Sequence, residues 1–192
     1  MPKTSYSFAM PEKLEKLPNI LQQNDPVLRQ KAKPVDLAML GTKEFKKIID
    51  DMRAAMYTQK DGVAIAAPQI GVSLQIFMVS GSVLSRAGKE YNGEKGDLVF
   101  INPRITKLSK DKHLVEEGCL SVRWLYGRIY RSTRATISAM NEKGDHIERG
   151  ASGLLAQIFQ HETDHLVGKL FIDKTEETWE MTEEEIAQAQ GK

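Results

Sequence analysis

The sequence contains almost no cysteine: Cys119 is the only one among 192 residues. A single thiol excludes an intramolecular disulfide, and a lone cysteine in a chain of this size is typical of a reducing compartment. The first twenty residues have no continuous apolar run, and Glu12 and Glu15 interrupt them, so neither a signal peptide nor an Arg-rich transit peptide is indicated. No segment is long and apolar enough to span a membrane. We therefore expect a cytoplasmic protein without a membrane partner.

An excess of charge of either sign is also lacking. Lys and Arg number 27 against 26 Asp and Glu, which gives a formal net charge of +1. This balance argues against broad electrostatic attraction to nucleic acid, so we expect no DNA partner. The length fits one domain, and the sequence shows no internal repeat. We expect a single domain over residues 1–192, with an irregular N-terminal arm (1–40) and an acidic C-terminal tail (174–192).

Three helices are expected from local patterns. Thr42 is a suitable N-cap for a helix whose apolar residues recur at helical spacing up to Met56, and Asp61-Gly62 would stop it. A second helix covers about 152–166. A third begins near Thr182, because three successive glutamates suit a helix N-terminus.

The strand signals are shorter. Residues 74–80 form an apolar, β-branched run, and residues 81–97 read as a polar surface loop. Further short strands are expected at 98–101, 104–108 and 113–118, and "EKGD" predicts a hairpin turn between 134–141 and 146–150. This order favours an α+β fold, with mostly antiparallel β-sheets packed around the central helix and with an N-terminal and a C-terminal helix.

The segment "FQHETDHLVG" contains the pattern H-E-x-x-H. His161 and His165 are four residues apart on the predicted helix, so both imidazoles lie on one face, roughly 6 Å apart, and can reach one divalent cation. Glu162 lies beside that face, where it can act on a water held by the metal. The alternative is a pair of histidines at the edge of the core beside a solvated glutamate.

A metal centre of this kind needs a third ligand. The metzincin continuation would place a histidine at position 171, which is Phe171, so that pattern is excluded. A gluzincin-like metalloprotease, the alternative function for this pattern, would use one of Glu183 to Glu185, which lie in the acidic tail. Cys119, in "EEGCLSV", is the stronger candidate, because a thiolate and two imidazoles leave a fourth position open for water. An inert buried thiol is the alternative for Cys119.

The segment "GVAIAAPQIG" is rich in small residues and ends near Gln69. Small side chains let the backbone approach a ligand closely, and the amide of Gln69 could donate a hydrogen bond to a developing oxyanion. A tight core crossing, in which Gln69 satisfies nearby backbone groups, explains the same pattern.

Three segments in this order resemble the peptide deformylase family. "GVAIAAPQ" (62–69), "EGCLS" (117–121) and "QHETDH" (160–165) match its three motifs with family-like spacing. The resemblance implies removal of the N-formyl group from the formylmethionine of nascent peptides, with release of formate. It implies one divalent metal, Fe(II) in the cell and Zn, Ni or Co in purified protein.

The resemblance also implies roles for individual residues. Cys119, His161 and His165 would bind the metal, and Glu162 would be the general acid/base. Gln69 and the backbone N–H of Leu120 would stabilise the oxyanion. The substrate backbone would be held by Val63 and Gly118, and the methionine pocket would be walled by Leu154 and Ile158.

Some residues depart from the family pattern. Ala64 replaces a glycine of the first motif, and Arg123 stands where a proline usually follows "CLSV", so residues 123–131 would form a loop of different shape.

Arg131 could pair with Asp164, or both could face solvent within a basic stretch at a strand edge. The acidic tail opposes the docking on the ribosome that some bacterial members achieve with a basic helix. A transient ribosome contact stays an open expectation, and so does a catalytically silent, deformylase-like binding protein.

Overall fold

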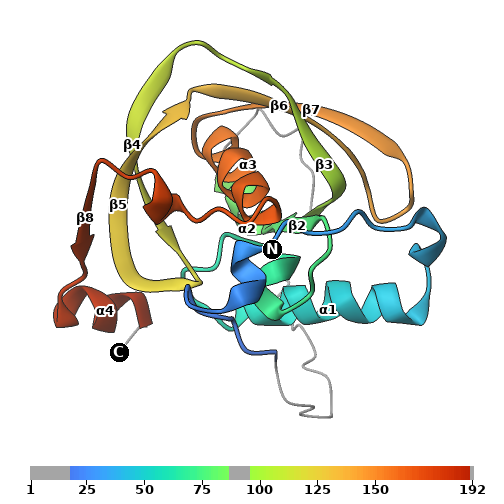
Figure 1. Cartoon of the computed structure of the whole chain (residues 1–192), viewed down its shortest axis with the longest axis horizontal. Helices are drawn as coiled ribbons and strands as arrows, with labels where there is room; N and C mark the ends of the chain where they lie inside the picture. The colour runs from blue at the N-terminus through green and yellow to red at the C-terminus, as the bar shows by residue number, and fades with distance from the viewer. Residues whose placement is uncertain (1–17, 87–95, 191–192) are drawn as a thin grey trace, which may run out of the picture.

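The computed structural model describes residues 18–86 and 96–190. Its strands form two antiparallel sheets (Figure 1). The first sheet has the order β1-β2-β3-β6-β7, made of Ala64–Ala66, Ile76–Val79, Leu98–Leu108, Arg134–Met140 and His146–Ser152. The second has the order β4-β5-β8, made of Lys112–Cys119, Val122–Ser132 and Glu177–Glu180. Strands β1 and β4 each lie at the edge of their sheet, and both edges border the functional site.

The described residues form four helices and several 3₁₀ turns, and α1 and α3 cover the first sheet. They are α1 (Lys43–Tyr57), α2 (Gly81–Arg86), α3 (Gly153–Leu166) and α4 (Glu183–Gln190), with 3₁₀ turns η1 (Pro26–Arg29), η2 (Leu37–Met39), η3 (Ala67–Ile70) and η5 (Phe171–Asp173). Helix α3 lies near the centre of the molecule, with strands on several sides, and α1 runs along the bottom of the view (Figure 1). Within the described ranges, no helix is both long and apolar enough to cross a membrane.

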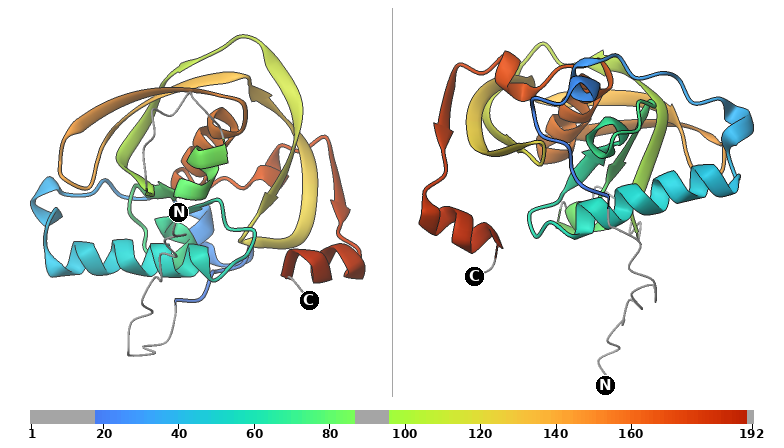
Figure 2. Two further views of the ribbon diagram at one scale, coloured as in Figure 1. Left: turned by 180° about the vertical axis from the view of Figure 1, so that it is seen from behind. Right: turned by 60° about the horizontal axis from the view of Figure 1, so that its bottom comes forward.

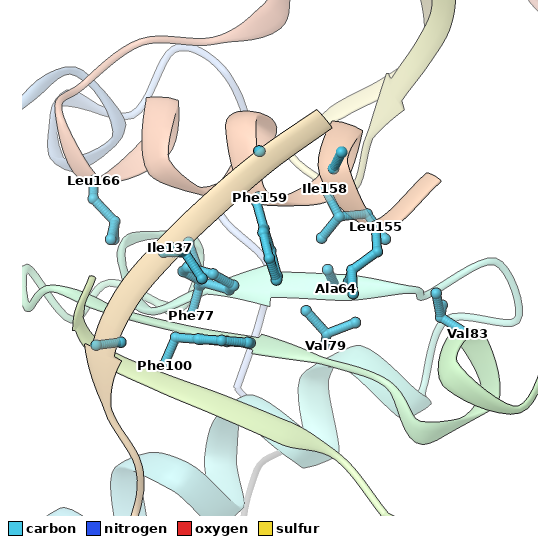
Figure 3. Close-up of a cluster of buried hydrophobic side chains, with 14 of the residues drawn as sticks. Ala64, Phe77, Val79, Val83, Phe100, Ile137, Leu155, Ile158, Phe159 and Leu166 are labelled. Carbon is cyan, nitrogen blue, oxygen red and sulfur yellow. The ribbon is translucent and has the colours of Figure 1, made fainter. Parts of the chain in front are cut away.

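Helices α3 and α1 pack on opposite faces of the β1-β2-β3 region. Phe77 and Phe100 stack at 4.6 Å, and Phe159 of α3 meets Phe100 edge-on at 5.2 Å. Figure 3 shows Leu155, Phe159 and other side chains of α3 directed at these strands. The alternate strand residues, Ile76 and Met78 among them, pack against α1 instead. Because both faces are covered, every residue of β2 is buried, which explains its continuous apolar sequence.

Several expected elements are confirmed. Helix α1 starts where predicted, with the Thr42 hydroxyl accepting a hydrogen bond from the Phe45 N–H at 3.2 Å, although it ends at Tyr57. Helix α3, the β6-β7 hairpin and the start of α4 also agree with the expectations. The α+β class, with antiparallel sheets around the central helix, is confirmed as well.

The predicted loop at 81–97 is wrong in its first part, because residues 81–86 form α2. The Gly81 N–H donates to Asp97 at 3.0 Å, so a residue distant in sequence caps this helix. Residues 87–95 lie outside the described residues. The two strands expected at 98–101 and 104–108 are a single strand, β3. Asn102 has a φ of 51° and binds the backbone of Val35, which makes a bulge where a break was predicted.

The predicted loop at 123–131 is also wrong, since these residues belong to β5. This strand pairs with β4 along one side and with β8, which was not predicted, along the other. Figure 2 shows β8 and α4 at the outer edge of the molecule, beside β5. The acidic tail therefore contributes a strand to the second sheet before it forms α4.

Candidate metal centre and active-site cleft

Three predicted ligands come together where β4 ends beside α3. One ligand atom from each of Cys119, His161 and His165 lies within 4.8 Å of the others. Cys119 Sγ is 3.2 Å from His165 Nε2, and the two imidazole rings have centroids 5.0 Å apart. His165 is buried, with 1% of its surface exposed. Glu183 to Glu185 are exposed on α4 and lie outside this cluster, so the gluzincin ligand set is not formed in the described part of the chain.

Two buried charged residues, Glu117 and Arg131, form a hydrogen-bonded network that contacts His161 through its Nδ1 atom. His161 Nδ1 lies 2.9 Å from Glu117 Oε2, which leaves Nε2 for the cluster. Glu117 also accepts two hydrogen bonds from Arg131, at 2.7 and 2.9 Å. Burial opposes ionisation of Glu117, but the hydrogen bonds from Arg131 and His161 outweigh it and hold the pKa of its carboxyl at about 2. Glu117 is therefore a fixed anion that orients the imidazole.

The same network reaches Asp164. Arg131 Nη1 donates to Asp164 at 2.7 Å, and Lys174 reaches the other oxygen of that carboxylate at 3.2 Å. The expected Arg131–Asp164 pair is thus present, and the expectation that Arg131 lies on a solvated edge is wrong, since only 6% of it is exposed. The pairing with Glu117 gives the buried guanidinium a second anionic partner.

Glu162 lies next to His161 on α3, and both residues line a cavity that also contains Cys119 in its wall. Its side chain is buried, and its Oε2 has no hydrogen-bond partner among the described residues. Burial raises the pKa of this carboxyl to about 7, against the opposing pull of His161. A carboxyl with a free oxygen and a pKa near neutrality is suited to accept and return a proton.

Gln69 faces the cluster from the turn after β1. Its side-chain oxygen accepts the Ala66 N–H at 2.8 Å, which fixes the orientation of the amide. Its Nε2 donates to Ser121 at 3.0 Å and points at Cys119 Sγ, 3.6 Å away. The amide therefore satisfies a nearby backbone group, as one of the two alternatives expected, and its Nε2 lies beside Cys119, whereas donation to an oxyanion stays a prediction.

A cleft opens in front of the cluster, between the edges of β1 and β4. It is lined by all ten residues singled out from the sequence except His165, which lies behind them in the core. Val63 is beside one wall and Gly118 is in the other, while Leu154 and Ile158 line it from α3. Gln157 donates its amide to the Glu116 carbonyl at 2.8 Å, so a backbone group satisfies its polar end.

The donor set fits a divalent cation. The Cys119 thiol and two imidazoles form a three-ligand set of the type used in catalytic sites. Although burial opposes a positive charge on His161, its hydrogen bonds with Cys119 and Glu117 raise its pKa well above the usual value. Burial and the charge of His161 lower the pKa of His165 well below its usual value, so this imidazole stays neutral, which is the form that binds a metal. The orphaned oxygen of Glu162 is a further buried polar atom that a hydrated cation would satisfy.

Sequence reasoning missed the role of Glu117. Residues two apart on a strand point to the same face, so Glu117 and Cys119 of β4 were a recognisable pair. It also missed Asp61, which precedes β1, and Trp124 and Tyr126 of β5, which line the cleft from two segments far apart in sequence. No local pattern indicated them, because they come together only when the segment before β1 and strand β5 fold onto the same cleft.

Comparisons with known proteins agree with this geometry. Residues 17–180 match the polypeptide deformylase family. The peptide deformylase of Halothermothrix orenii is 44% identical over 151 residues, which cover 78% of this chain and 88% of that protein. Peptide deformylase 1A of Arabidopsis thaliana, described as chloroplastic/mitochondrial, is 39% identical over 181 residues, which cover 90% of this chain and 67% of that protein.

Solved structures give the same result. The peptide deformylase of Synechococcus elongatus in complex with actinonin has a TM-score of 0.73 and 31% identity, covering 98% of this chain and 93% of that one. The class I type b peptide deformylase of Acinetobacter baumannii with Met-Ala-Ser bound has a TM-score of 0.71 and 32% identity, covering 81% and 96%. This chain therefore belongs to the peptide deformylase family, the hydrolases that remove the formyl group from the N-terminal formylmethionine of newly made polypeptides.

Proposed function

We propose that Cys119, His161 and His165 hold one divalent metal ion and that Glu162 moves the proton during deformylation. The observation that carries this proposal is the meeting of three ligand atoms within 4.8 Å beside a buried carboxyl with a free oxygen. We propose Fe(II) as the metal in the cell, with Zn, Ni or Co in purified protein. When bound, the metal supplies Lewis-acid polarisation and lowers the pKa of water.

The chain's own residues would handle the proton and the charge. Glu162 accepts a proton from the attacking water and returns it to the departing amine, so the peptide leaves with a free N-terminus. Negative charge develops on the former formyl oxygen, and the Gln69 amide and the Leu120 N–H donate to it. The bond from Ala66 to Gln69 fixes the amide in advance, so little reorganisation is needed during the reaction.

The substrate would bind as an extra strand between the two open sheet edges. Backbone groups of Val63 and Gly118 would pair with the peptide main chain. The methionine side chain would lie against Leu154 and Ile158, whose apolar surfaces suit a thioether. A Cβ at Gly118 would lie 2.7 Å from the Tyr126 ring, so only glycine leaves this wall in its present position.

Residues 1–192 would act as one catalytic domain, with the arm at 1–40 and the tail at 174–192 as parts of it. We propose the cytoplasm as its location, where a reducing environment preserves a thiolate ligand. The Arabidopsis relative is chloroplastic/mitochondrial, so imaging of the tagged protein in its own cells distinguishes these locations. A transient ribosome contact would deliver nascent peptides, and co-sedimentation with ribosomes tests it.

The direct test is release of formate from formyl-Met-Ala-Ser under anaerobic conditions. The protein loaded with Fe(II) or Ni(II) should turn over, the metal-free protein should not, and reloading should restore activity. Absence of turnover by fully loaded protein would contradict the proposal and favour a silent binding protein.

Cys119→Ser separates this site from a protease site. The variant should lose metal and formate release, because the set loses its thiolate ligand. If Cys119→Ser keeps its metal and cleaves internal peptide bonds, the ligand assignment is wrong. The wild-type protein, assayed on an N-blocked peptide without a formyl group, is the matched control.

A further inference from the structure

An ion pair lies across the active-site cleft, away from the metal cluster. Arg123 Nη1 donates to Asp61 at 2.6 Å, and Nη2 donates to the other oxygen of the same carboxylate at 3.2 Å. A third hydrogen bond joins Arg123 to Gln59 at 2.8 Å. Both charged side chains line the same cavity as Cys119. They lie at its rim, with 18% of the Arg123 side chain and 30% of the Asp61 side chain exposed.

The pair joins the two walls of the cleft. Asp61 lies between α1 and β1, two residues before Val63, and Arg123 lies at the start of β5, which pairs with β4. Trp124 also holds the guanidinium in place, with its ring centroid 4.7 Å from the Arg123 Cζ. The bidentate geometry and the aromatic contact keep both charges in fixed positions beside the path of a bound peptide.

We infer that Arg123 and Asp61 are specificity-determining residues for the third residue of the substrate, and that their mutual neutralisation makes the enzyme indifferent to its charge. This inference rests on the proposed function. A strand advances about 3.3 Å per residue, so a peptide that pairs with Val63 at its methionine and runs toward Asp61 brings its third residue near the pair.

Charge compensation at this position has a chemical purpose. Newly made polypeptides carry acidic, basic and neutral residues after methionine, and an unpaired charge at the rim would favour one class. The other carboxylates that line the cavity pair with arginines that do not line it, or lie deeper: Glu116 pairs with Arg128 at 3.1 Å, Glu117 with Arg131 at 2.7 Å, and Glu162 is buried. The Arg123–Asp61 pair is therefore the charged feature that a downstream side chain meets at the rim.

The test compares formyl-Met-Ala-Glu and formyl-Met-Ala-Lys, both with amidated C-termini. In the wild-type enzyme kcat/KM for the two peptides should be similar. Asp61→Asn leaves Arg123 uncompensated and should favour the Glu peptide by about two- to five-fold, the range expected for partly exposed charges. Arg123→Gln leaves Asp61 uncompensated and should favour the Lys peptide by a similar factor. The change should appear mainly in KM.

The controls separate charge from general damage. Lys46→Gln and Asp50→Asn remove matched charges from a surface pair on α1 that does not line the cleft, and they should leave the ratio unchanged. The double variant Asp61→Arg with Arg123→Asp restores a neutral pair and should return the ratio toward the wild-type value. Asp61→Asn changes almost no side-chain volume, so it reports on the inference even if Arg123→Gln does not fold.

Binding measurements make the result independent of turnover. Calorimetric titration of the metal-loaded protein with Met-Ala-Glu amide and Met-Ala-Lys amide should show the same opposite preferences in the two single variants. If wild-type protein releases no formate, the proposed function fails, while the binding ratios still decide this inference. The inference is overturned if both single variants shift the ratio in the same direction, or if neither shifts it.

Discussion

The Glu117 carboxylate lies 2.9 Å from His161 Nδ1, on the side of the imidazole that faces away from Cys119 and His165. This contact fixes the ring orientation and makes the opposite nitrogen more basic. Glu117 is itself held by Arg131, so a buried guanidinium, a buried carboxylate and an imidazole form one chain of contacts that ends at the cluster.

We predict that Glu117→Gln weakens metal binding by about 10- to 100-fold, because the amide keeps the size of the side chain but removes the charge that supports His161. Metal content after dialysis against a graded series of chelator concentrations measures the effect. Glu116→Gln, a change at the neighbouring residue with a largely exposed side chain, is the control and should retain its metal. Equal retention in both variants would remove Glu117 from the support of the site.

We predict that Arg131→Ala lowers the free energy of unfolding by about 3–5 kcal/mol, because it leaves the buried carboxylate of Glu117 without its strongest partner. Denaturant unfolding of metal-free protein measures this loss without a contribution from metal binding. Arg128→Ala removes an arginine from the same strand whose partners, Glu116 and Glu177, are exposed, and it should have little effect. A similar small effect for both variants would show that the buried network of Arg131 does not contribute to the free energy of unfolding.

The pair between Arg29 and Asp173 should make stability depend on pH. Burial opposes ionisation of Asp173, but the hydrogen bond from Arg29 and that from the Leu170 N–H lower its pKa below the ordinary value of 3.8. A lowered pKa in the folded chain adds stability that is complete above the ordinary value and is lost as the pH falls through the folded value.

We therefore predict that wild type is more stable than Asp173→Asn at about pH 6 and that this difference shrinks toward about pH 3. The asparagine can still accept the Leu170 N–H, so the comparison isolates the charge. Denaturant unfolding of both proteins across this range checks the prediction. A difference that stays constant with pH would contradict it.

The sequence alone predicted those elements that are stabilised by residues a few positions away along the chain. The Thr42 cap and the apolar spacing predicted α1, and "EKGD" predicted the β6-β7 turn, since these signals act within a few residues. The cluster of Cys119, His161 and His165 was predicted from H-E-x-x-H and a lone cysteine, because the two histidines share one helix face. Histidine and cysteine are preferred metal ligands, so their spacing in the sequence was enough to suggest a metal site.

The missed elements depend on distant partners. Strand β5 has an irregular pattern that resembles a loop, and pairing with β4 and β8 makes it a strand. The sequence left open whether Arg131 pairs with Asp164 or faces solvent, because Glu117 and Asp164 meet it only after the sheet and α3 pack together. The Arg123–Asp61 pair likewise joins residues from two segments that no local signal connects.

We propose that Glu162 moves the proton at a metal held by Cys119, His161 and His165. The most direct test is formate release from formyl-Met-Ala-Ser by wild type and Glu162→Gln at equal metal content. Because Glu162 Oε2 has no partner among the described residues, the substitution removes no known hydrogen bond of that atom. We predict unchanged metal content and a loss of kcat of about 10²-fold or more. Wild-type rates in the fully loaded variant would contradict the account.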